Sequence, residues 1–82
     1  QLAQTSFEGA DLRNTNLKDA NMQSANLKKA NLTGAHLPHA HLTQAYLQGA
    51  NLSNTNLRGA KLQSTNLDSA GLTGADLTDA QL

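Results

Sequence analysis

The sequence predicts a solenoid of square cross-section, in which the chain turns a corner once every five residues. A strict five-residue period of apolar side chains and an echo between the two halves of the chain are the observations that predict it. Every fifth residue from Leu2 to Leu82 is a leucine, except Phe7 and Met22, and no leucine lies outside this register. A fixed short period of this kind indicates one repeating structural unit.

Neither regular secondary structure accounts for a five-residue spacing. In an α-helix, with about 100° of rotation per residue, successive leucines would be rotated by roughly 140° and would scatter around the cylinder. In a flat strand the side chains alternate between two faces, so an odd spacing would place leucines on both. A chain that bends once per pentad can instead point every leucine inward.

The number of pentads in one coil follows from the longer echo. FEGADLRNTNLKDA, from Phe7, aligns with LQGANLSNTNLRGA, from Leu47, and QSANLKKANLTGA, from Gln23, aligns with QSTNLDSAGLTGA, from Gln63. Both shifts are forty residues. Such a shift returns each copy to the same side of the solenoid if a coil holds twenty residues, but not if it holds fifteen. We therefore predict about four coils of four pentads, forming a single domain over residues 1–82.

Each place in the pentad has its own residue preference. Two residues before the apolar residue stands Ala or Thr, which is small enough for the narrow interior near a corner. The residue directly before it is most often Asn or Asp, whose side chains hydrogen-bond to nearby backbone and tolerate turns. Glycines recur two residues after it, next to the corner, and are interpreted as turn residues; these are Gly9, Gly34, Gly49, Gly59 and Gly74.

The unit A-[N/D]-L-x-x, as in ANLKK, ANLTG, ANLSN and ADLTD, resembles the repeat of the pentapeptide repeat family, and the resemblance covers the whole chain. It implies an all-β fold, the right-handed quadrilateral β-helix, in which the central apolar residue and the small residue two before it fill the interior. The other three places would face solvent. The predicted structural core is Phe7, Leu12, Leu17, Met22, Leu27, Leu32, Leu37, Leu42, Leu47, Leu52, Leu57, Leu62, Leu67, Leu72 and Leu77.

The two ends of such a solenoid are its expected weak points. An open terminal coil exposes apolar side chains and unpaired backbone groups, and neither end of the sequence offers a helical pattern or an apolar plug. The sequence also begins at Gln1. We therefore expect it to be part of a longer chain. A flanking segment, a partner, or a second copy stacked end to end is expected to cover at least one end.

Composition argues against several classes of partner. Six basic and six acidic residues leave no net charge, so no strong field draws the chain toward nucleic acid or a membrane surface. Lys28 and Lys29 are neighbours, but no aromatic platform for bases accompanies them. No apolar run approaches the roughly 20 residues of a membrane span. Without cysteine there is no disulfide framework.

The stretch AHLPHAHLTQAYL, residues 35–47, contains all three histidines and the only tyrosine and proline. His39 and His41 flank one inward residue, so their side chains could lie about 6 to 7 Å apart. A two-histidine metal site would lack a third ligand, and the spacing matches no zinc pattern, so we predict no metal. We predict instead a candidate interaction patch of His36, His39, His41 and Tyr46, with the tyrosine as its apolar anchor. The alternative is that all four are ordinary exposed side chains.

Catalysis has little support in the sequence. There is no cysteine nucleophile, and no serine stands in a glycine-flanked turn between a strand and a helix. The carboxylates are expected on a convex surface, without a pocket that could shift their pKa values. We therefore predict no catalytic residue and no cofactor.

The predicted function is a non-catalytic scaffold or protein-interaction module, with a partner that the sequence does not identify. The resemblance implies an alternative, because some pentapeptide repeat proteins mimic duplex DNA in shape and charge and bind type II topoisomerases such as gyrase. That mechanism needs a long and strongly acidic rod. Here only the last coil, with Asp68, Asp76 and Asp79, is locally acidic. Proteins that resemble this chain are common in cyanobacteria, both inside the cell and in the thylakoid lumen.

Overall fold

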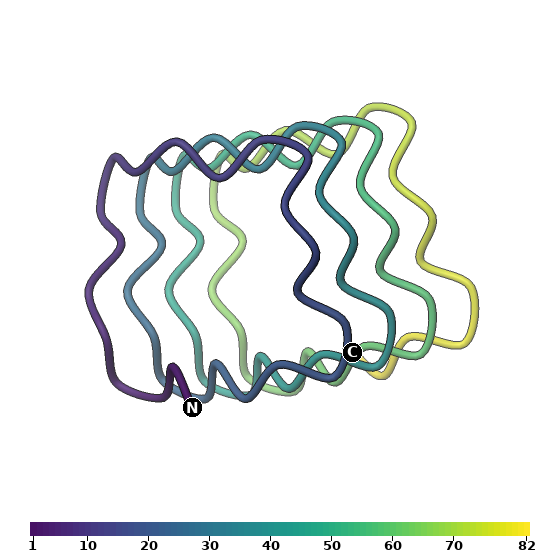
Figure 1. Ribbon diagram of the computed structural model, residues 1–82, viewed down its shortest axis with the longest axis horizontal. Coiled ribbons are helices and arrows are strands. Elements are labelled where there is room, and N and C mark those ends of the chain that lie inside the picture. The colour runs from purple at the N-terminus through teal and green to yellow at the C-terminus, as the bar shows by residue number, and fades with distance from the viewer.

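The computed structural model describes all residues, 1–82, and the chain winds as a right-handed coil with four sides (Figure 1). It contains no α-helix and no continuous strand, because each side of a coil contributes a single residue to the parallel pairing. Twelve parallel β-bridges, from Ser6–Asn26 to Lys61–Gln81, all join residues twenty positions apart. The predicted coil of twenty residues is therefore confirmed, and the molecule measures 26 × 22 × 20 Å.

We name the four sides after one inward residue of each, as the Phe7, Leu12, Leu17 and Met22 sides. They follow one another around the tube in this order, so the Phe7 side lies opposite the Leu17 side. The inward residues are, side by side, Phe7, Leu27, Leu47 and Leu67; Leu12, Leu32, Leu52 and Leu72; Leu17, Leu37, Leu57 and Leu77; and Leu2, Met22, Leu42, Leu62 and Leu82. Residues at equivalent places in successive coils form a column along the tube.

Backbone hydrogen bonds of two kinds hold the coils. Sixteen of the 53 close the corners, where the N–H of the small residue donates to the carbonyl three residues earlier, as from Ala40 to Leu37 at 3.1 Å. The other thirty-seven join consecutive coils. Tyr46 is typical, because its carbonyl accepts from Leu27 at 2.7 Å and its N–H donates to Ala25 at 3.0 Å. Where a coil has neighbours on both sides, this pairing leaves out one kind of backbone N–H, that of the residue directly after the apolar position.

All sixteen corners have the same conformation. The residue two after the apolar residue has a positive φ, between 58° and 73°, as the third residue of a type II turn requires. The five predicted turn glycines all occupy this place, so their interpretation is confirmed. Eleven other residues adopt the same left-handed conformation, including Lys29 and His39 with φ of 59°. The fold therefore imposes the turn even where the residue does not favour it.

The core is closed in the middle of the tube and open at its ends. The inward residues from Met22 to Leu62 are buried, with at most 3% of their surface exposed. The inward residues of the first and last coils are only partly buried, and Leu82 is 78% exposed. Thr55 is buried in place of alanine, and its hydroxyl donates to the Leu52 carbonyl at 2.8 Å. No helix of the length and apolarity needed to cross a bilayer is present.

Candidate interaction surface

The outer surface of the tube offers no enclosed site. It has no pocket, and no three side chains of His, Cys, Asp or Glu converge as metal ligands would.

Most outward Asn and Asp side chains have a structural role. Asn16 is typical, because its Oδ1 accepts a hydrogen bond from the backbone N–H of Lys18 at 3.1 Å, across the inward leucine. All nine Asn and Asp residues directly before the apolar position make this bond, as their predicted turn-forming role requires. They are Asp11, Asn16, Asn21, Asn26, Asn31, Asn51, Asn56, Asn66 and Asp76.

The histidine-rich segment interrupts this arrangement at three consecutive pentads, where His36, His41 and Tyr46 replace Asn. At the first of these pentads the residue after the leucine is Pro38, which has no backbone N–H. The loss of the Asn acceptor therefore leaves no donor unpaired there. Proline also suits the second position of a type II turn. At the other two pentads the N–H of the residue after the leucine has no side-chain acceptor. This segment therefore has an unusual composition and also lacks the side-chain hydrogen bonds to backbone N–H groups that the Asn and Asp residues make elsewhere.

The structure does not bring the four predicted patch residues together on one side. His36 pairs with Asn16 and Asn56 on the Leu17 side, and His41 pairs with Asn21 and Lys61 on the Met22 side. Tyr46 pairs with Asn26 and Asn66 on the Phe7 side, which is opposite to that of His36. All four patch residues are exposed. One flat partner surface could contact His39 and His41 across their shared corner, but could not contact His36 and Tyr46 at once.

His39 packs against the next coil. A Cβ atom placed on Gly59 would lie 2.5 Å from the Nδ1 atom of His39, so the imidazole covers the glycine directly. The absence of a side chain at position 59 is what makes room for the ring. This histidine therefore has a structural contact, whatever else it binds.

Tyr46 has a cationic neighbour on the Phe7 side. The Nζ atom of Lys28, in the preceding coil, lies 5.6 Å from the centroid of the tyrosine ring, within the range of a cation–π interaction. Tyr46 as a whole remains 46% exposed. Sequence reasoning noted Lys28 only beside Lys29 and did not pair it with the tyrosine.

The missed pair follows a spacing of eighteen residues. The same spacing joins Asn26 to Glu8 at 3.5 Å, and Arg58 to Asp76 at 3.4 Å. It also joins Gln63 to Gln81 at 2.7 Å. In each case the residue after the apolar position of one coil reaches the residue before the apolar position of the next coil. A search for side-chain pairs eighteen residues apart in the sequence would therefore have predicted the contact of Lys28 with Tyr46.

Two exposed carboxylates have altered acidity. The pKa of Asp11 is lowered to about 2, first because the Arg13 side chain donates to it from Nε and Nη2, both at 2.8 Å, and then because the Arg13 backbone N–H also donates to it. The pKa of Asp76 is lowered mainly by the hydroxyl and backbone N–H of Thr78, with a smaller effect of Arg58. Both groups face solvent, so these are local ion and hydrogen-bond effects without a catalytic pocket.

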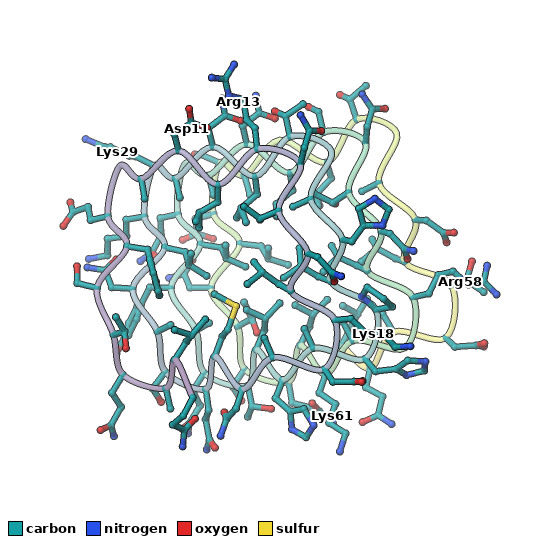
Figure 2. The ribbon with its side chains drawn as sticks, in the orientation of Figure 1. Asp11, Arg13, Lys18, Lys29, Arg58 and Lys61 are labelled. Carbon is teal, nitrogen blue, oxygen red and sulfur yellow. The ribbon has the colours of Figure 1, made fainter.

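Charge is separated along the tube. The two middle coils, residues 22–61, contain four cations and no acid. Figure 2 shows the labelled cations on different sides of the tube, with Arg13 at the top, Arg58 at the right and Lys61 at the bottom. No side gathers them into a basic face of the kind that nucleic acid requires. The acids belong to the first and last coils and are Glu8, Asp11, Asp19, Asp68, Asp76 and Asp79.

The twenty-residue coil, the inward leucines and the type II corners define a right-handed quadrilateral β-helix with a convex, pocketless exterior. The family model described as pentapeptide repeats matches in eight copies, over residues 1–34, 25–63 and 50–82. These matches span the whole chain, which therefore belongs to the pentapeptide repeat family.

Three solved cyanobacterial structures are similar. The pentapeptide repeat protein alr5209 of Nostoc PCC 7120 is 40% identical over 89% of this chain, with a TM-score of 0.88. Rfr23 of Cyanothece 51142 is 32% identical over 88%, with a TM-score of 0.62. HetL of Nostoc sp. PCC 7120, a protein involved in heterocyst differentiation regulation, is 35% identical over 99%, with a TM-score of 0.50. The matches cover 60%, 63% and 46% of those chains. A comparison with curated protein sequences gives no match.

Proposed function

We propose that this domain is a non-catalytic scaffold that binds another protein through one of its outer sides. The observation that carries the proposal is the division between a uniform interior and a variable exterior. Inward leucines and corner residues repeat from coil to coil, whereas one outward column reads Ser6, Asn26, Tyr46 and Asn66. A regulatory role such as that of HetL is compatible with a module that acts by binding.

An outer side is favoured over end-to-end self-association. If copies stacked in register, the last coil of one would continue the columns of the first coil of the next. Asp68 would then stand beside Glu8 of the next copy, and Asp79 beside Asp19. Repulsion between these like charges disfavours end-to-end stacking. Partner binding on a side carries no such penalty.

The alternative, a DNA mimic that binds or inhibits gyrase, has weaker support. A mimic needs carboxylates along the shaft, where the phosphates of DNA would lie. All acids of this chain lie in the first and last coils, and the middle of the shaft is cationic. Inhibition of gyrase supercoiling by micromolar protein would favour this alternative over the scaffold.

The scaffold proposal is tested by site-specific photo-crosslinking. A photoreactive residue replaces Ser53, Arg58, Gln63 or Asp68, which places one probe on each side at a similar height. In extracts of the source organism, we expect one side to form a discrete adduct that excess unlabelled protein suppresses. The captured protein is then purified and its binding measured directly. Equal labelling from all four sides, without competition, would contradict the proposal.

A further inference from the structure

The Phe7 side carries a group of residues that the fold does not require. Tyr46 is the one large apolar side chain exposed away from the chain ends, since the other is Leu82. Its column otherwise contains small polar residues, of which Asn26 and Asn66 each accept a hydrogen bond from the backbone N–H two residues later. The aromatic ring therefore adds exposed apolar surface and removes a backbone contact, which indicates a use in binding.

Two consecutive lysines of the preceding coil, Lys28 and Lys29, lack ion-pair partners. The only salt bridges of the chain are Arg13–Asp11 and Arg58–Asp76, so Lys28 and Lys29 are both unpaired. Lys28 lies near the Tyr46 ring. Lys29 follows at the corner between the Phe7 and Leu12 sides, at the upper left of Figure 2, in a left-handed conformation. Its stem packs over Gly49, whose added Cβ would lie 3.5 Å from the lysine Cγ.

Gln48 adds two unsatisfied polar groups at the same place. At nine other pentads the equivalent backbone N–H donates to an outward Asn or Asp, but Tyr46 cannot accept this bond, and the N–H of Gln48 has no partner. The backbone N–H of the residue directly after the apolar position therefore points toward the outer surface. The Oε1 atom of Gln48 is also buried without a hydrogen-bond partner. A backbone donor, the Lys28 ammonium group and an aromatic ring thus lie on the Phe7 side, and Lys29 lies at its corner with the Leu12 side (Figure 2).

We propose that Lys28, Lys29, Tyr46 and Gln48 form a docking site for an acidic segment of a protein partner. Carboxylates of the partner contact the two ammonium groups and the Gln48 N–H, and an apolar residue packs on the tyrosine ring. The site extends along about two coils, or roughly 10 Å. This inference rests on the proposed scaffold function and names the chemistry of its partner.

The same side favours a short acidic peptide over nucleic acid. Glu8 and Asp68 occupy the column of Lys28 and Gln48 in the first and last coils, one at each end of the site. These carboxylates repel a polyanion that extends beyond the middle coils, whereas a peptide with two or three acidic residues fits between them. Stacking of successive bases is also disfavoured, because Phe7, the only other residue of the Phe, Tyr and Trp class, points inward and packs against the core.

The test is a titration of the ¹⁵N-labelled chain followed by NMR. The probe is a capped four-residue peptide of three glutamates and one leucine, and the comparison probes are its lysine counterpart and a ten-nucleotide thymidine oligomer. We expect only the glutamate peptide to shift the amides of Lys29, Gln48 and Gly49. The double variant Lys28→Gln/Lys29→Gln should bind on the order of tenfold more weakly.

Two variants provide matched controls. Lys18→Gln/Lys61→Gln removes the same charge from unpaired lysines on other sides, and should weaken binding less than about twofold. Tyr46→Asn restores the side-chain acceptor that the Gln48 N–H lacks, so it should fold well and yet bind the peptide weakly. Absence of shifts with the wild-type chain, equal weakening by both lysine pairs, or equally tight binding of the oligomer would each overturn the docking site. The scaffold function would survive that failure if photo-crosslinking captured a partner on another side.

Discussion

At the scale of single residues, the corners show that the backbone hydrogen bonds between coils override the conformational preference of the individual residue. A left-handed conformation costs a residue with a side chain about 1–2 kcal/mol, yet Lys29, His39 and Gln44 all adopt it. The corner hydrogen bond and the bonds to neighbouring coils hold these residues in place. Glycine is therefore preferred at this place but needed only where a neighbouring side chain occupies the space above it.

A comparison of Gly59 with Gly49 separates the cost of the left-handed conformation from the cost of a collision with a neighbouring side chain. Alanine at either position has the same unfavourable φ, so we expect both variants to lose about 1 kcal/mol of unfolding free energy. Only at Gly59 would the new Cβ collide with the His39 ring. Gly59→Ala should therefore shift the imidazole proton resonances of His39, whereas Gly49→Ala should leave them unchanged. Unchanged His39 resonances in Gly59→Ala would show that the ring does not cover the glycine.

The acidity of Asp11 is set by one neighbour. Because the pKa of this carboxyl is lower in the folded state than in the unfolded chain, its ion pair stabilises the fold above about pH 4, and the effect is lost as the pH falls toward 2. Arg13→Gln should raise the pKa of Asp11 toward 3.8 in a carboxyl ¹³C titration. Arg58→Gln should move the pKa of Asp76 less than Thr78→Ala does, because the threonine is the larger cause there. A pKa of Asp11 that stays near 2 without the arginine would contradict this assignment.

At the scale of the pentad, sequence chemistry predicts the turns well and the side-chain pairs poorly. Asn and Asp before the leucine were interpreted as backbone-binding residues, and all nine are. That prediction uses only contacts between residues two apart. The pair of Lys28 and Tyr46 instead depends on how side chains lean between coils, which periodicity does not contain. The separation of His36 and Tyr46 onto opposite sides of the tube, by contrast, follows from the predicted coil of four pentads, because the two residues lie two pentads apart.

The worth of one Asn contact can be measured in the third coil. The Oδ1 atom of Asn51 accepts from both the backbone N–H and the hydroxyl of Ser53, at 3.0 and 2.7 Å. Asn51→Ala should lower the free energy of unfolding by about 0.5–1.5 kcal/mol in urea. His41→Ala, at the same place in a pentad without this contact, should change it by less than about 0.5 kcal/mol. Equal losses would show that the Asn contact contributes nothing beyond an exposed side chain.

At the scale of the whole molecule, the fold was predictable because one period fixes it. Leucine at every fifth residue admits one inward direction, and the echo at forty residues sets four corners per coil, as the bridge from Tyr46 to Asn66 confirms. The site was less predictable, since a prism exposes four unrelated surfaces and its interior pattern says nothing about which one is used. The distribution of stability along the tube follows from the burial of the core, which is complete in the middle coils and partial at each end.

Leu47 and Leu67, in the inward column of the Phe7 side, test whether stability falls from the middle coils toward the ends. Leu47 is 1% exposed between two neighbouring coils, whereas Leu67 is only partly buried in the last coil. Leu47→Ala should therefore cost about 2–5 kcal/mol of unfolding free energy, through lost burial and a cavity that the neighbouring coils cannot fill. Leu67→Ala should cost less than about half as much, because its side chain already contacts solvent. Native-state hydrogen exchange should agree, with slow exchange at the amide of Leu47, which donates to Asn66, and fast exchange at that of Leu67, which has no backbone acceptor. Equal costs at the two positions would show that Leu67 is packed as fully as Leu47, and equal exchange protection would show that the chain opens as one cooperative block.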